Sequence, residues 1–198
     1  MLRIVGNDTF SPSASSALLV LVPSKKGEAV LRKEVKAVLS SLAVDTKALF
    51  AAYKFTGAAG SSVAHLGSDG THAIPVVCVG VGNLDKSTDE NMEVVRRALG
   101  GGINALRKSE KKHVSIMLPT AKEVDLTHEE LIRQAAILLH IATYSFVAFK
   151  QKKEVWTPEF IFVGSGKGDK TAIAAGSAIG VAMNRTRTLA DTPPNHMT

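Results

Sequence analysis

Residues 62–82 read S-V-A-H-L-G-S-D-G-T-H-A-I-P-V-V-C-V-G-V-G, and this stretch decides what kind of sheet the chain can form. Two runs of strand-forming residues flank the tetrapeptide Ser68-Asp69-Gly70-Thr71. An Asp-Gly pair supplies the positive φ angles that a tight hairpin turn demands. The sequence therefore predicts that residues 63–66 pair antiparallel with residues 74–81.

Cys78 lies within the apolar part of this stretch and is the one cysteine of the chain. Burial favours the neutral thiol, so we expect an unreactive side chain in the core. A single cysteine also excludes a disulfide framework within the chain and a cysteine-only zinc site.

Strand and helix patterns alternate on both sides of the hairpin. Upstream, residues 18–22 form a wholly apolar run that stops at Pro23, which is typical of a buried strand, and apolar residues then recur at helical spacing from Leu31 to Leu42. Downstream, the sequence predicts a helix over 92–106, with a capping box at Ser87 and Glu90, and then a strand over 114–118 that ends at Pro119. A second helix is predicted over 131–149, with a capping box at Thr127 and Glu130. A strand over 160–163 and a last helix that begins at 172 and ends at 189–191 complete the order. This order predicts an α/β fold, and the hairpin makes its sheet mixed. We expect three layers, with the sheet sandwiched between helices.

Glycines interrupt two of the predicted helices. Gly100, Gly101 and Gly102 each cost about 1 kcal/mol relative to Ala in a helix interior, so they either allow close packing or mark a break. Gly176 and Gly180 are expected to let the last helix pack closely on the sheet.

Composition places the chain among ordinary globular domains. It has 198 residues, 45% of them hydrophobic, and a net charge of +6 from 24 Lys and Arg against 18 Asp and Glu. The longest mostly apolar run, 135–149, is shorter than the roughly 18 residues that a membrane span needs. The N-terminus also lacks the pattern of a secretory signal, so we expect no membrane association and a cytoplasmic location.

Basic residues are scattered in small clusters: Lys25-Lys26, Arg32-Lys33-Lys36, Arg107-Lys108 with Lys111-Lys112, and Lys150 with Lys152-Lys153. Most of them fall at the ends of predicted helices, where they keep the surface solvated. No aromatic residues interleave with them to stack bases, so nucleic-acid binding is not favoured.

Two glycine-rich turns resemble nucleotide-binding loops without matching them. In the run 164–171, G-S-G-K-G-D-K-T, Asp169 stands where a phosphate loop needs glycine, and its carboxylate would repel phosphate. A strand-to-helix connection with an Asp cap is the favoured interpretation. Gly80-Val81-Gly82 lacks the third glycine of the dinucleotide fingerprint, since Asp85 occupies that position, so it is interpreted as a turn.

No histidine or carboxylate has the spacing of a metal site. His128-Glu129-Glu130 resembles the start of a helical zinc motif, but Ile132 stands where the second His would be, and we interpret His128 and Glu129 as solvated residues of a first helical turn. The remaining histidines show no ligand spacing: His65, His72, His113, His140 and His196. No catalytic, cofactor-binding or metal-binding residue is assigned on any position of this chain.

The C-terminal run 184–198, N-R-T-R-T-L-A-D-T-P-P-N-H-M-T, resembles the segment that joins the two domains of the leucyl (cytosol) aminopeptidase family. Six residues match the R-x-L-x-x-T-P-P-N pattern of that segment: Arg187, Leu189, Thr192, Pro193, Pro194 and Asn195. Upstream, residues 77–83 are similar to the family's strand and Gly-x-Gly turn, and residues 144–150 to the end of one of its helices.

The resemblance implies that residues 1–191 form a noncatalytic N-terminal domain with a macro-domain-like fold. Residues 192–198 would begin the linker to a C-terminal catalytic domain, and the chain would be a fragment that ends at this junction. Family members release N-terminal amino acids from peptides with two divalent metal ions (zinc, manganese or magnesium) and assemble as homohexamers. Because their metal ligands lie beyond the linker, the resemblance implies that this chain alone is inactive.

Two other classes of function stay open at this point. A free-standing macro-like module would bind a nucleotide or ADP-ribose with its phosphates near residues 164–168. A nucleic-acid-binding accessory domain would use the basic clusters, and its affinity would fall steeply with salt.

Overall fold

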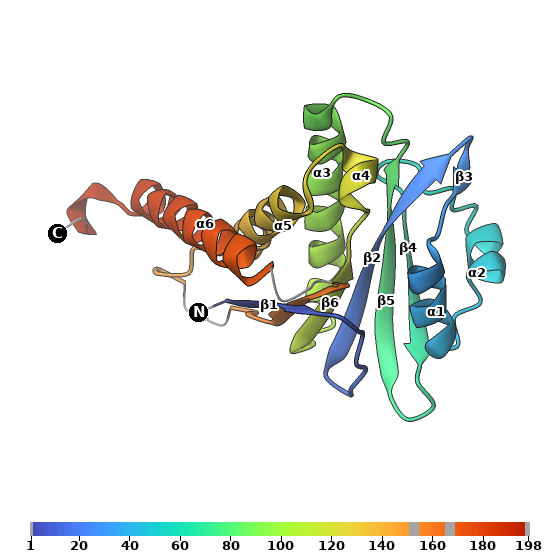
Figure 1. Cartoon of the computed structure of the whole chain (residues 1–198). Coiled ribbons are helices and arrows are strands. Elements are labelled where there is room, and N and C mark those ends of the chain that lie inside the picture. Colours follow the sequence, from blue (N-terminus) through green and yellow to red (C-terminus); the bar gives the residue numbers. More distant parts are fainter. Residues whose placement is uncertain (1, 151–154, 165–168, 197–198) are drawn as a thin grey trace.

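The structure, a computed structural model, describes residues 2–150, 155–164 and 169–196. Helices cover both faces of a central sheet, and the last helix, α6, extends away from the body of the domain (Figure 1). This arrangement confirms the predicted mixed sheet between helices. The likeness to macro domains stays a prediction.

The seven strands of the described residues form one sheet in the order β1-β7-β6-β2-β5-β4, with β3 paired to β2 outside this path. Their bounds are β1 Arg3–Asn7, β2 Ser16–Lys25, β3 Glu28–Ala29, β4 Ser62–Ser68, β5 Ala73–Gly82, β6 His113–Met117 and β7 Glu159–Val163. Neighbouring strands along the path are parallel except for β4, which runs antiparallel to β5. The predicted hairpin is thus confirmed, and Cys78 is 1% exposed in the middle of β5.

The helices are α1 Lys33–Ser41, α2 Thr46–Ala52, α3 Thr88–Arg107, α4 Ala121–Val124, α5 His128–Thr143 and α6 Asp169–Asp191, followed by the short 3-10 helix Pro194–His196. Buried residues of α1 and α2 pack on one face of the sheet, around Leu18, Val20 and Cys78. Residues of α3, α4, α5 and α6 form a larger core on the other face, around Leu19, Phe160 and Phe162. The odd and even residues of β2 therefore serve opposite cores, as alternation along a strand requires.

Two expectations about element boundaries are wrong. β2 does not end at Pro23 but continues to Lys25, because a register shift between Val22 and Pro23 accommodates the proline within the strand. α5 ends at Thr143 rather than continuing to Phe149, because Tyr144 adopts an extended conformation there. Its hydroxyl donates to Asp191 Oδ2 at 2.9 Å, so this residue joins the end of α5 to the end of α6.

The glycines in the helices have different surroundings. α3 is continuous through Gly100, Gly101 and Gly102, and a methyl group at Gly102 would overlap the side chain of Leu19, so this glycine lets α3 approach β2. Gly176 and Gly180 do allow close packing, but against α5 rather than the sheet, since added methyl groups would overlap the Arg133 carbonyl and the His140 side chain.

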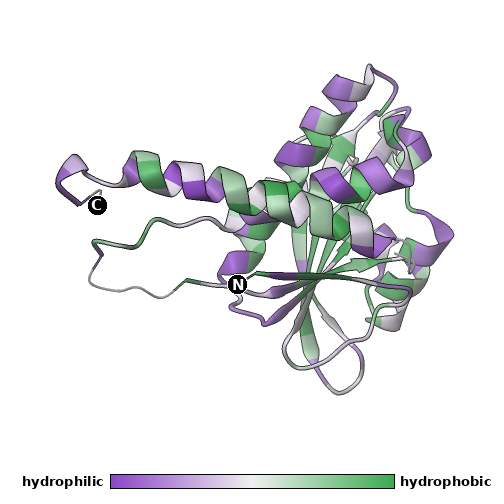
Figure 2. Cartoon of the chain, turned by 60° about the vertical axis from the view of Figure 1, so that its left-hand side comes forward, coloured by the Kyte–Doolittle hydropathy of each residue, from purple (hydrophilic) through white to green (hydrophobic). Residues whose placement is uncertain are grey.

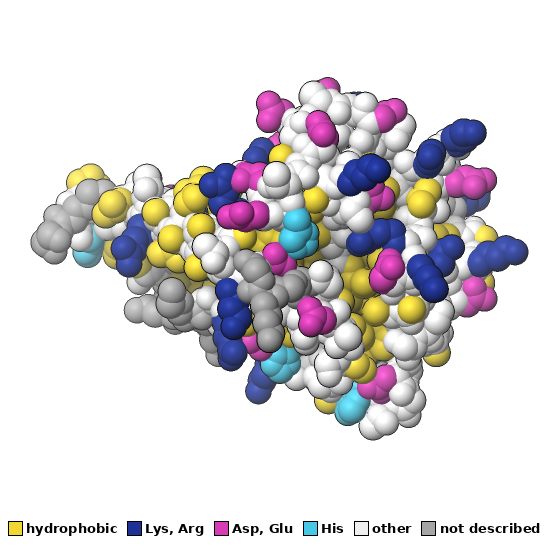
Figure 3. Space-filling view, viewed as in Figure 1, with side chains coloured by type: hydrophobic (Ala, Val, Ile, Leu, Met, Phe, Trp, Pro, Cys, Tyr) yellow, Lys and Arg dark blue, Asp and Glu magenta, His cyan; other side chains and the backbone are white. Residues whose placement is uncertain are grey.

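α6 is apolar on two sides. Ala172, Ile173 and Gly176 pack toward α5, while Ile179, Met183 and Leu189 are 41%, 41% and 63% exposed. The hydropathy colouring shows apolar residues along the projecting part of this helix (Figure 2), and the space-filling view shows them gathered on its surface (Figure 3). In the part of the chain that the structure describes, no helix combines the length and the apolar character needed to cross a membrane.

Candidate functional site

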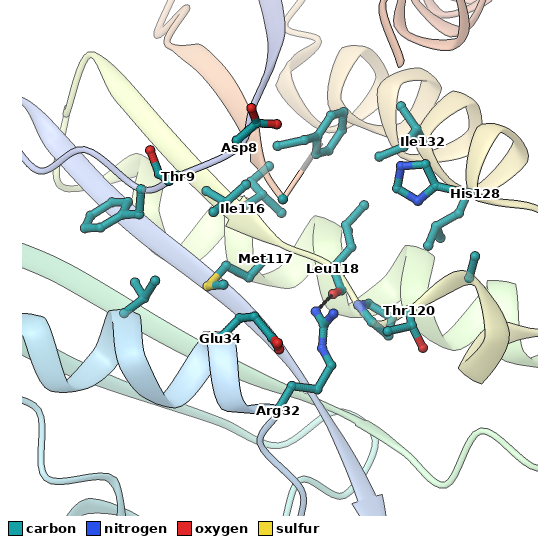
Figure 4. Close-up of a pocket in the computed structure, with 18 of the residues that line it drawn as sticks. Asp8, Thr9, Arg32, Glu34, Ile116, Met117, Leu118, Thr120, His128 and Ile132 are labelled. Carbon is teal, nitrogen blue, oxygen red and sulfur yellow. Dashed lines mark hydrogen bonds between the residues drawn. The ribbon is translucent and has the colours of Figure 1, made fainter. Parts of the chain in front are cut away.

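A pocket of about 660 Å³ opens between α1 and α5 at the carboxyl ends of β6 and β7 (Figure 4). The chain that leaves β1, residues 8–10, closes another side. After β2 and the short β3, the chain forms α1 on one face of the sheet, whereas after β6, the neighbour of β2, it forms α4 and α5 on the other face. Such a reversal of winding leaves a crevice outside the carboxyl ends of parallel strands, which is where ligands bind in open α/β sheets.

Apolar side chains form most of the pocket wall. They come from α1, from the segment that follows β1, from the ends of β6 and β7, and from the first turns of α5: Val38, Phe10, Ile116, Leu118, Phe162, Leu131 and Ile132. The space-filling view shows apolar surface between charged side chains on this face of the molecule (Figure 3). The pocket therefore resembles a small-molecule site, with an apolar wall and few polar groups.

Arg32 and Glu34 line the pocket from the start of α1, and Asp8 lines it from the end of β1. The Arg32 guanidinium donates from Nη2 to the carbonyl oxygen of Leu118 at 2.5 Å, which ties α1 to the end of β6. Neither Arg32, Glu34 nor Asp8 forms an ion pair with another of the described residues. The pocket thus offers one fixed guanidinium and two carboxylates that ligand groups can use.

His128 also lines the pocket, and its Nε2 lies 2.9 Å from Oδ2 of Asp169 at the start of α6. The Asp169 side chain is 9% exposed and that of His128 is 54% exposed. The interpretation of His128 as a solvated residue of a first helical turn is confirmed, and its imidazole also connects the first turn of α5 to α6. Residues 165–168 of the predicted Asp-capped loop lie outside the described residues.

The contacts that the structure shows for the other histidines are structural and do not indicate catalysis. His72 Nδ1 lies 3.0 Å from Asp69 Oδ2 in the hairpin turn, and His113 contacts Ser15 and Glu159. The ring of His196 packs on Phe149. His140 is buried, and this burial lowers its pKa because the charged form loses hydration.

Cys78 and the glycines after it also match their structural interpretations. Burial raises the pKa of the Cys78 thiol to about 12, so it stays neutral at physiological pH. Gly82 adopts a φ of +70° and donates from its backbone N–H to the carbonyl oxygen of Gly57, which makes it a turn glycine. A methyl group at Gly80 would overlap the backbone at Ala58.

The residues described here do not fit a two-metal centre. Across the described ranges 2–150, 155–164 and 169–196, no three His, Cys, Asp or Glu side chains come together in a group that could hold a metal ion. His128 with Asp169 supplies two donors, whereas two bridged metal ions need a larger set of ligands.

Sequence reasoning missed the residues that shape the pocket. The prediction of a solvated cluster at Arg32, Lys33 and Lys36 is wrong for Arg32, which is half-buried and donates to the Leu118 carbonyl. Asp8 was not singled out because β1 itself, with its sequence R-I-V-G-N, was not predicted. The usable signal was positional: polar residues that follow parallel strands meet at one edge of the sheet.

The fold and the pocket define an α/β domain with a ligand-sized crevice at the carboxyl edge of its sheet. Residues 10–153 match the N-terminal domain of the cytosol aminopeptidase family, and the chain belongs to this family. A probable cytosol aminopeptidase from Streptomyces avermitilis is 31% identical over 156 residues, which cover 72% of this chain. The chain spans 29% of the length of that relative.

Solved structures of the same fold include a mutant of tomato leucine aminopeptidase, with a TM-score of 0.75 and 16% identity. The match covers 100% of this chain and 40% of the tomato chain. The bottromycin maturation enzyme BotP, in complex with Mn, has a TM-score of 0.65 and 19% identity, with 94% of this chain and 34% of BotP covered. At sequence identities of 16% and 19%, these structural similarities show that the fold is shared and nothing more.

Proposed function

We propose that this chain serves as the noncatalytic N-terminal domain of a metal-dependent leucyl aminopeptidase that releases N-terminal amino acids from peptides. One observation carries the proposal: residues 10–153 match the N-terminal domain of the family, while the match to the Streptomyces relative covers 29% of that relative's length. The remaining length of such a relative leaves room for a separate catalytic domain.

Two divalent metal ions (zinc, manganese or magnesium) would be held by that catalytic domain. The name of the BotP structure, which includes Mn, supports manganese as one of these ions. When bound, such ions activate water and stabilise the charge of the transition state. This domain's own residues contribute a folded scaffold and a ligand-sized pocket.

The proposed boundary places the domain at residues 1–191 and the start of the linker at 192–198. α6 ends at Asp191, and the prolines that follow cannot continue it. The exposed Ile179, Met183 and Leu189 on α6 are apolar surface that a neighbouring domain would cover. We propose the catalytic domain of the same protein as that partner, in a cytoplasmic homohexamer that acts on peptides.

The experiment compares the 198-residue chain with a polypeptide from the same reading frame that continues through the proposed catalytic domain. Both are incubated with leucine 4-nitroanilide and Mn²⁺, and release of nitroaniline is followed. We expect hydrolysis from the longer polypeptide, loss of that hydrolysis with a chelator, and none from the 198-residue chain. Metal-dependent hydrolysis by the 198-residue chain would overturn the assignment of a noncatalytic domain.

A further inference from the structure

We propose that the pocket between α1 and α5 binds a small zwitterion with an apolar body, either an apolar amino acid or a short apolar peptide with free ends. The proposed function leaves this pocket unused, since the catalytic metals would lie in another domain. The inference about binding rests on the pocket alone. The further idea that the ligand is a substrate or product of the aminopeptidase rests on the proposed function.

The size and the wall of the pocket fit a small apolar ligand. Its volume of about 660 Å³ lies within the usual range of about 300–1,000 Å³ for small-molecule sites. Ile116 and Phe162 line it from the sheet and Leu118 from just beyond β6, together with Val38 and Phe10. An aliphatic side chain placed here would leave water for an apolar surface, which stabilises binding by about 25 cal/mol per Å².

Arg32 is positioned to bind a carboxylate. Its hydrogen bond to the Leu118 carbonyl fixes the side chain at the edge of the pocket, so little rotamer entropy is lost when a ligand binds. A guanidinium has five N–H donors, and those that Leu118 does not engage can pair with the two oxygens of a carboxylate. Figure 4 shows the guanidinium beside Leu118 and Thr120, among the residues that line the pocket.

Glu34 and Asp8 are positioned to bind an ammonium group. Glu34 lies in the first turn of α1, and Figure 4 shows it near Arg32, with Asp8 on the other side of Ile116 and Met117. Neither carboxylate forms an ion pair with another described residue. A cation of the ligand can therefore pair with either carboxylate without displacing a protein group.

The mixture of charges selects a zwitterion over a phosphate. A nucleotide would bring several negative charges into a pocket that Glu34 and Asp8 line, with Arg32 as their main counter-ion, and like charges repel. A free amino acid or peptide carries one positive and one negative end, which matches the two kinds of group in the pocket. The apolar wall adds a preference for aliphatic over polar side chains.

The test is isothermal titration of the 198-residue chain with L-leucyl-L-leucine and L-leucine, which distinguishes a peptide from a free amino acid. We expect saturable binding of one or both with a Kd of ~1 mM or tighter. N-acetyl-leucine lacks the ammonium group and leucinamide lacks the carboxylate. Each should bind about tenfold more weakly than leucine or not measurably, because one charge-assisted hydrogen bond is lost.

Variants locate the site. Arg32→Leu and Glu34→Gln should each weaken binding about tenfold or more, whereas Lys33→Leu, which removes a neighbouring charge outside the pocket, should leave the Kd unchanged. A thermal unfolding scan of each variant checks that it folds, and the ligand analogues test the same contacts without any substitution. The proposal is overturned by the absence of saturable heat up to about 10 mM of both ligands, by binding of the two blocked analogues that is as tight as that of leucine, or by ADP-ribose binding in place of these ligands. None of these outcomes depends on hydrolysis, so the proposed function is tested separately.

Discussion

The hairpin half of the sheet, β4 and β5, and the pocket half, β1, β7 and β6 with α5 and α6, are held together by different contacts. In the hairpin half, β4 and β5 pair across a short turn in which Asp69 accepts hydrogen bonds from the backbone of Thr71 and His72. In the pocket half, Arg3 of β1 pairs with Glu159 of β7, and α6 packs closely on α5. The first half depends on neighbours in the sequence and the second on residues far apart.

The largest expected effect comes from breaking the core of the pocket half. Phe160 in β7 is fully buried, and its register partners are Ile4 of β1 and Val114 of β6. Phe160→Ala should lower the free energy of unfolding by about 3–5 kcal/mol, because it removes a large apolar side chain and leaves a cavity. Urea unfolding followed by circular dichroism measures this.

Phe149→Ala is the matched control, since Phe149 is 54% exposed and lies outside the sheet. It should change the free energy of unfolding by less than about 0.5 kcal/mol. Equal losses for the two variants would contradict the view that β7 ties the pocket half together.

The difference between the halves explains which elements could be predicted from the sequence. The Asp-Gly turn, the Ser87 and Thr127 caps and the helix end before Pro193 are local signals, and each gave a correct element. Local signals failed for features that depend on contacts between residues far apart in the sequence. β1 is a short strand with two apolar residues, and only pairing with β7 makes it part of the sheet. The end of α5 depends on Tyr144, whose hydroxyl bonds to Asp191.

The candidate site was less predictable than the fold for the same reason. Arg32 and Asp8 belong to different parts of the chain, and only the strand order brings them to one pocket. α2, which Asp45 caps by accepting from the backbone of Lys47 and Ala48, was also missed because it spans only seven residues. Asp45 was a local signal that could have predicted it.

Alanine substitutions at two helix glycines are expected to change the free energy of unfolding in opposite directions, which sharpens the comparison. A methyl group at Gly176 would overlap the Arg133 carbonyl of α5, while one at Gly100 of α3 would meet open space. Gly176→Ala should therefore lower the free energy of unfolding by about 1–3 kcal/mol through overpacking. Gly100→Ala should raise it by about 0.5–1 kcal/mol, because Ala has the higher helix propensity.

Thermal and urea unfolding of both variants provide the measurement. If Gly100→Ala destabilised the protein as much as Gly176→Ala, the loss could not be attributed to close contact between α5 and α6.

A smaller, pH-dependent effect is expected at His140, which lies between α5 and α6 near Gly180. Its Nε2 has no hydrogen-bond partner among the described residues, and burial lowers its pKa below the ordinary value of 6.5. The unfolded chain therefore binds a proton at higher pH than the folded chain does, so stability is present above pH 6.5 and decreases as the pH falls below it. His140→Leu removes this titration.

The free energy of unfolding of the wild type and of His140→Leu is measured from pH 8 to pH 5, a range chosen to span the ordinary pKa of about 6.5. As the pH decreases, the free energy of unfolding of the wild type should become smaller relative to that of His140→Leu. A difference that stays constant with pH would show that His140 does not titrate differently in the folded and unfolded chains.

The smallest effect is expected in the hairpin turn, where the groups are exposed to solvent. The hydrogen bond with the His72 side chain, together with the backbone N–H groups of His72 and Thr71, lowers the pKa of Asp69 from 3.8 to about 2. Because the folded pKa lies below the unfolded one, the turn's contribution is present above about pH 4 and is lost as the pH falls toward 2. Asp69→Asn should slightly destabilise the protein at pH 7, and its difference from the wild type should shrink in acid.

Thr71→Ala keeps the backbone donor and should show no such convergence. If the Asp69→Asn difference stayed the same from pH 7 to pH 3, the carboxylate would not be what holds this turn, and the local signal on which the hairpin was predicted would be the Gly70 conformation alone.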